Sequence, residues 1–98
     1  MQSWNILKKD EEGNKYNIRV YYRNNKLVID DVGYIPKGKR KATFIGSGLT
    51  NDYGWRALAW EGRREAQKEA ILKVVPKQLL LEALTDVWSN LQPTEIKF

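Results

Sequence analysis

Four cationic side chains fall within five residues, at Lys37, Lys39, Arg40 and Lys41. We call this group the basic turn. Cations at this density neutralise phosphates, and phosphate neutralisation supplies much of the affinity of proteins for nucleic acid. The same spacing also fits a turn that is simply solvated. The basic turn is therefore the first candidate contact surface, with nucleic acid as its candidate partner.

A second group alternates along the chain. Arg19, Tyr21 and Arg23 occupy every other position of a segment in which the intervening residues, Val20 and Tyr22, are apolar. In a strand such residues share the face opposite the core. Two cations flanking an aromatic ring could bind phosphates while the ring stacks on a base. The alternative is that Arg19 pairs with Asp30 and the Tyr21 ring covers Val28.

A third group points to a protein partner. If the segment around it is helical, one flank of that helix carries Arg56, Trp60, Arg63, Arg64 and Gln67. An exposed Trp60 would anchor a partner protein, and a homodimer is one form of such an interaction. The competing interpretation is that a second helix buries Trp60 together with Ile71.

The residues that carry most enzyme chemistry are missing or poorly placed. The chain has no Cys and no His, so thiol nucleophiles, His-based triads and the usual catalytic zinc ligands are excluded. The carboxylates at Asp30 and Asp31 point to opposite faces of a regular strand, and those at 10–12 lie in a turn. The Gly-Ser-Gly segment at 46–48 suits a phosphate-binding loop, but the other residues of such a fingerprint are missing around it. We expect no enzymatic activity, no metal and no cofactor.

The net charge of +5 over 98 residues is unevenly distributed. Residues 1–50 hold ten basic and five acidic side chains, whereas residues 51–98 hold seven of each. No apolar run approaches the ~20 residues that span a bilayer, and the N-terminal residues lack the apolar core of a signal peptide. We therefore expect a cytoplasmic protein whose excess charge lies in its first half.

Alternating residues in that half predict strands. The segment 15–23 alternates strictly, and Asn24-Asn25 suits a two-residue turn into a strand from Lys26 to Tyr34 or Ile35. This turn pairs Tyr22 with Leu27, Val20 with Ile29, Tyr21 with Val28 and Arg19 with Asp30. The segment from Pro36 to Lys39 predicts a turn, 40–47 a third strand, and 4–7 an additional outer strand.

The second half follows a helical period. A stripe of mostly small residues from Trp55 to Val74 predicts a helix that begins near Tyr53, capped within 50–52, with Gly62 at a close backbone contact. Pro76 separates it from a second helix, which we expect Pro93 to end. The apolar stripe of that second helix contains Leu80, Ala83, Leu84, Val87, Trp88 and Leu91.

Together these patterns predict one α+β domain over residues 1–98. A three- to four-stranded antiparallel sheet (1–49, basic) precedes two α-helices packed on one face of it (50–92, net neutral) and a tail (93–98). The predicted function is non-enzymatic binding of nucleic acid, with a protein-interaction module or small regulator as the alternative. The predicted contact residues are Arg19, Tyr21, Arg23, Lys37, Lys39, Arg40 and Lys41; those of the alternative are Arg56, Trp60, Arg63 and Arg64.

Overall fold

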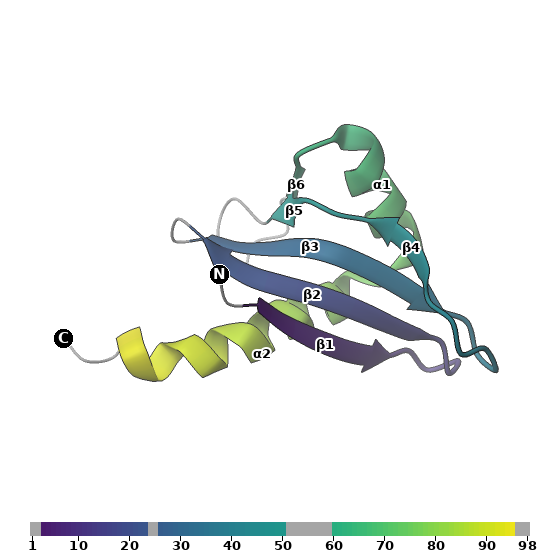
Figure 1. Ribbon diagram of the computed structural model, residues 1–98, viewed down its shortest axis with the longest axis horizontal. Helices are drawn as coiled ribbons and strands as arrows, with labels where there is room; N and C mark the ends of the chain where they lie inside the picture. Colours follow the sequence, from purple (N-terminus) through teal and green to yellow (C-terminus); the bar gives the residue numbers. More distant parts are fainter. Residues whose placement is uncertain (1–2, 24–25, 51–59, 96–98) are drawn as a thin grey trace.

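The computed structural model describes residues 3–23, 26–50 and 60–95. It is an α+β fold in which an antiparallel sheet precedes two helices (Figure 1). The long strands are β1 (Ser3–Lys9), β2 (Lys15–Arg23) and β3 (Lys26–Ile35). The short strands are β4 (Thr43–Gly46), β5 (Leu49–Thr50) and β6 (Glu61–Gly62), and the helices are α1 (Glu65–Val74) and α2 (Lys77–Glu95).

The sheet has the order β1-β2-β3-β5-β6, and β4 pairs with another part of β3. The hairpin of β2 and β3 has the predicted register: Val20 pairs with Ile29, Tyr21 with Val28 and Tyr22 with Leu27. A bulge follows, so Arg19 pairs along the backbone with Asp31 and not with Asp30. The predicted ion pair is nevertheless present, because Arg19 Nη2 lies 2.6 Å from Asp30 Oδ2. The bulge thus brings both carboxylates to Arg19, and the prediction that Asp30 and Asp31 point to opposite faces was wrong.

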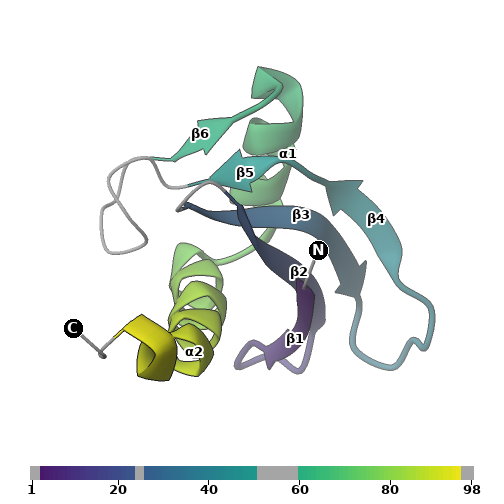
Figure 2. The same ribbon diagram turned by 60° about the vertical axis from the view of Figure 1, so that its left-hand side comes forward.

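The core lies between one face of this sheet and the helices. Strand alternation directs Ile18, Val20 and Ile29 inward, where they are fully buried. Of the predicted stripe of α2, Leu80, Ala83, Leu84 and Val87 are buried and Trp88 is partly buried. Leu91 lies outside the residues whose side chains are described. Figure 2 shows α2 along one side of the curved sheet, where Lys8 of β1 also contacts Asp86 at 2.8 Å. The opposite side of the sheet, which we call the outer face, carries Arg19 and Arg23.

Three predicted boundaries were wrong. The third strand covers only Thr43–Gly46, because the chain at 39–42 leaves the sheet. The first helix begins at Glu65, and Glu61–Gly62 form a strand beside β5; the predicted start near Tyr53 lies outside the described residues. Pro93 does not end α2, which runs to Glu95. A proline removes one backbone hydrogen bond and often bends a helix without ending it.

Gly62 does lie at a close contact, though in a strand and not in a helix. A Cβ built on Gly62 would lie 2.5 Å from Lys68 Cβ. Gly46 ends β4, and Ser47 and Gly48 connect it to β5, so this segment leads into a strand and not directly into a helix. None of the helices in the described ranges is long and apolar enough to cross a bilayer.

Candidate nucleic-acid interface

The outer face of β2 carries a cation at every fourth residue. Lys15, Arg19 and Arg23 all lie on this face, because each is an even number of residues from the others. The stripe is roughly 26 Å long at ~3.3 Å per strand residue. Lys15 also lies directly opposite Lys9 on β1. Like charges in this position repel each other, so a bound anion would be stabilised between them.

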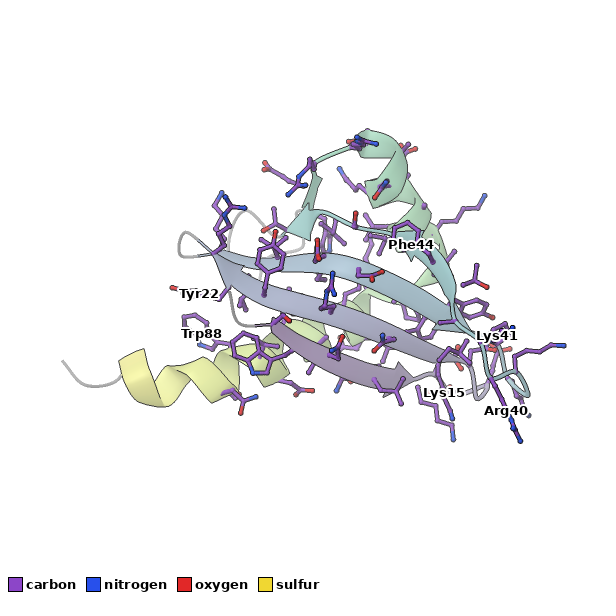
Figure 3. The ribbon with its side chains drawn as sticks, viewed as in Figure 1. Lys15, Tyr22, Arg40, Lys41, Phe44 and Trp88 are labelled. Atoms are coloured by element: carbon purple, nitrogen blue, oxygen red, sulfur yellow. The ribbon has the colours of Figure 1, made fainter. Side chains whose placement is uncertain are left out.

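The basic turn lies at the Lys15 end of this stripe. Figure 3 shows Lys15, Arg40 and Lys41 at the same end of the sheet, opposite the end that carries Tyr22. The turn forms as predicted: the Lys39 amide donates to the Pro36 carbonyl at 2.9 Å, and Gly38 has a φ of 80° that favours glycine. All four cations of the basic turn are exposed, and none makes an ion pair with another described residue.

The neighbouring turn between β1 and β2 supports the basic turn. The amide of Lys37 donates to Asn14 Oδ1 at 2.9 Å. Asn14 is itself held by the Asp10 carboxylate, which also accepts a hydrogen bond from the Tyr16 hydroxyl at 2.9 Å. Within the acidic segment 10–12, the Asp10 carboxylate therefore stabilises the turn between β1 and β2.

These hydrogen bonds shift two pKa values. Partial burial tends to raise the pKa of Asp10, but the hydrogen bonds from Asn14, Tyr16 and Glu12 outweigh it and lower the pKa below 3.8. Burial, followed by the hydrogen bond to Asp10, raises the pKa of Tyr16 from 10.0 to about 12. The Tyr16 contribution to stability is thus complete below pH 10 and lost as pH rises through 12. That of Asp10 is present above pH 3.8 and lost as pH falls through its lowered pKa.

Replacing Asp10 with Asn should lower the pKa of Tyr16 towards 10, because the charge and the best acceptor for its hydroxyl are both lost. The variant should also melt at a lower temperature at pH 7. The phenolate absorbance of the folded protein, titrated through pH 12, measures the first effect. Tyr16→Phe identifies the Tyr16 contribution to that titration, and an unchanged curve in Asp10→Asn would contradict the assignment.

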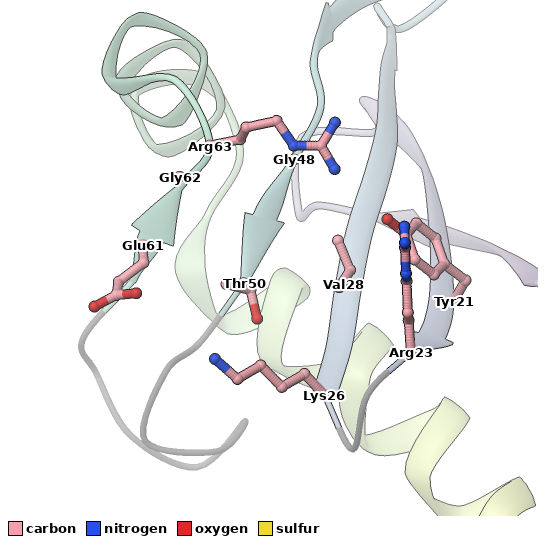
Figure 4. Close-up of a pocket in the computed structure, with 9 residues that line it drawn as sticks. All are labelled: Tyr21, Arg23, Lys26, Val28, Gly48, Thr50, Glu61, Gly62 and Arg63. Atoms are coloured by element: carbon pink, nitrogen blue, oxygen red, sulfur yellow. The ribbon is translucent and has the colours of Figure 1, made fainter.

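The other end of the stripe borders a hollow of about 430 Å³, which we call the strand-end hollow. Three cations from separate elements line it: Arg23 of β2, Lys26 of β3 and Arg63, which follows β6. In Figure 4, Arg63 extends across Gly48 towards Val28, whereas Glu61 points away from the arginines. A smaller neighbouring hollow adds Arg19 and Asp30 to the same surface.

Gly48 positions Arg63 over the sheet. The Arg63 amide donates to the Gly48 carbonyl at 2.8 Å. A Cβ on Gly48 would lie 3.1 Å from Arg63 Cβ, and its φ of 73° also favours glycine. Sequence reasoning placed Arg63 on a helix flank and did not include Lys26. The predicted hairpin places Lys26 opposite Arg23, and this pairing was the signal that could have identified Lys26.

The structure changes the roles of two predicted aromatic residues. Tyr21 lies on the outer face as predicted but is only 8% exposed, so it offers no free ring for a base. Trp60 is 6% exposed and belongs to the core with Ile71, which contradicts its use as an exposed anchor. Its predicted helical ridge is also wrong, because Arg63 and Arg64 precede α1. Arg56 lies outside the described residues.

The predicted contact residues therefore divide into two groups. The basic turn lies at the Lys15 end of the outer face, Arg23 lies at the other end of β2, and Arg19 lies between them with its charge partly compensated by Asp30. A scan against protein-family models, a search of curated proteins and a search of solved structures each found no match to this chain.

Proposed function

We propose that this protein is a non-enzymatic nucleic-acid-binding domain and that the nucleic acid lies along the outer face of the sheet. The observation that carries the proposal is the position of cations at both ends of one open face. Lys15, Arg23 and the basic turn make no ion pairs with other described residues. A polyanion running along β2 would neutralise both groups, and such a ligand is available in the cytoplasm.

The geometry favours an extended polyanion over a small anion. The two cationic groups are separated by the length of β2, roughly 26 Å. A single phosphate reaches one group only, whereas a nucleic acid presents a phosphate every ~3.4 Å of duplex axis on each strand. The alternative of a protein partner loses its proposed anchor, because Trp60 is buried.

A salt titration tests the proposal. Labelled oligonucleotides, single-stranded and duplex, would be titrated with the protein at salt concentrations from ~50 to ~200 mM. Four or more phosphate contacts predict a slope of log K against log salt of about −3 or steeper. Absence of binding to either nucleic acid at ~50 mM salt would overturn the proposal. A dimer seen by light scattering, together with that absence, would favour the protein-interaction alternative.

A further inference from the structure

Phe44 is a large aromatic residue exposed on the outer face. Its side chain is 59% exposed, although it lies within strand β4. Phe44 pairs with Gly33, which pairs with Asn17 on β2, so these three residues form one row across the outer face. Single exposed apolar residues are common. The surroundings of Phe44, and not its exposure alone, suggest a ligand.

The segment that joins the basic turn to β4 packs on the outer face over Gly33, the residue that pairs with Phe44. A Cβ on Gly33 would lie 3.2 Å from Ala42 Cβ, so the segment before β4 packs where a larger residue would stand. Arg40 and Lys41 immediately precede Ala42. Lys15 lies one row further along, two strands away, which corresponds to about 12 Å between the Cα atoms of Lys15 and Phe44. The ring thus lies at the edge of the cationic surface.

We propose that the ligand is single-stranded nucleic acid and that Phe44 is the residue on which a base stacks. The inference rests on the proposed function and specifies its substrate class. Single-strand binders combine a cationic track for the phosphates with exposed rings for the bases. A duplex keeps its bases stacked inside, so a ring on an open sheet face gains little from it. Tyr21 cannot perform this role because neighbouring side chains bury it.

The Phe44 ring and the cations bind different parts of the nucleic acid. Arg40, Lys41 and Lys15 hold phosphates, which sets the dependence of affinity on salt. Phe44 contacts a base face, which adds affinity without changing that dependence. This division separates the inference from phosphate binding alone, because a neutral substitution at Phe44 then lowers affinity at every salt concentration by the same factor.

The test compares Phe44→Leu with Phe44→Tyr by fluorescence anisotropy on labelled oligothymidine and on a mixed-sequence duplex. The leucine variant should lose about 5- to 150-fold in affinity for the single strand, with the salt slope unchanged, and the tyrosine variant should stay within about twofold of the parent. Neither substitution should change duplex binding by more than about twofold. Circular dichroism verifies that the variants are folded.

Leu7→Ala is the matched control, because Leu7 is also 59% exposed and lies in the same row on β1. It should leave single-strand affinity within about twofold. Unchanged single-strand affinity in Phe44→Leu, or a parent that prefers the duplex, overturns this inference while nucleic-acid binding stands. A parent that binds neither oligonucleotide overturns both proposals. Equal losses in Phe44→Leu and Leu7→Ala would also overturn it and point to a generally apolar contact, as with a protein partner.

Discussion

Replacing Arg40 and Lys41 together with glutamine should lower the affinity for single-stranded nucleic acid by on the order of 10- to 100-fold at ~50 mM salt. Each phosphate contact contributes a slope of about −0.7 on a single strand, which amounts to nearly tenfold in affinity between ~1 M and ~50 mM salt. Both side chains are exposed and make no ion pair with other described residues, so the substitutions leave the fold intact. The salt slope should flatten by about 1.4.

The matched control is Lys73→Gln with Lys77→Gln. These lysines are also exposed and their loss changes the net charge by the same amount, but they belong to the helices and not to the outer face. The control should keep its affinity within about threefold and should keep the parent slope. Equal losses in both double variants would show that net charge, and not the basic turn, governs binding. Filter binding or anisotropy across salt concentrations measures both quantities.

The sheet was predictable where sequence alternation and turn chemistry agreed. In the hairpin of β2 and β3, only one register brings Val20 opposite Ile29 and leaves Arg19 near Asp30, so the pattern determined the pairing. The bulge beside Arg19 was not predicted. One extra residue changes the backbone partner of Arg19, but the 2.6 Å ion pair with Asp30 still forms, so this pair of residues gives no sign of the bulge in the sequence. The position of Arg19 and Arg23 on one face of the sheet follows from this hairpin.

The segment before α1 was not predictable from its period. Small and apolar residues at helical spacing continue back from Ala70 through Gly62, yet Gly62 pairs with Leu49 in a strand. Tertiary packing overrides helix propensity here: Gly62 lies so close to Lys68 that a Cβ would not fit. Arg63 consequently leaves the predicted helix flank and lies over the sheet.

The burial of Tyr21 also could not be predicted from strand alternation. Alternation assigns a residue to a face, but exposure depends on the neighbouring side chains of that face. Tyr21 lies in a row with Ser3 and Val28, and Figure 4 shows Arg23 beside its ring. Phe44, in contrast, lies on a four-residue strand whose row contains a glycine, so fewer neighbouring atoms cover it. Which of these two aromatic residues is exposed therefore depends on strand pairing at the edge of the sheet.

Removing a carboxylate from the outer face should have the opposite effect to removing cations. Asp30→Asn is expected to raise the affinity for single-stranded nucleic acid several-fold at ~50 mM salt. In the parent, Arg19 donates to Asp30 at 2.6 Å, and this hydrogen bond and the opposite charge raise the pKa of Arg19 above its ordinary value. Once the carboxylate is neutral, the guanidinium in the middle of the β2 stripe is available to a phosphate. The salt slope should steepen by about 0.7.

Asp86→Asn provides a control with the same change in net charge. Asp86 pairs with Lys8 at 2.8 Å, and it belongs to α2, which packs on the opposite side of the sheet. Its substitution removes the nearer of two carboxylates that pair with Lys8, the other being Glu82 at 3.8 Å, and does so away from the proposed path of the nucleic acid. Tighter binding in Asp30→Asn alone requires the ligand to pass over Arg19, between the basic turn and the strand-end hollow. A gain in both variants would assign the effect to net charge, and a gain in neither would mean that the two cationic groups do not bind one continuous ligand.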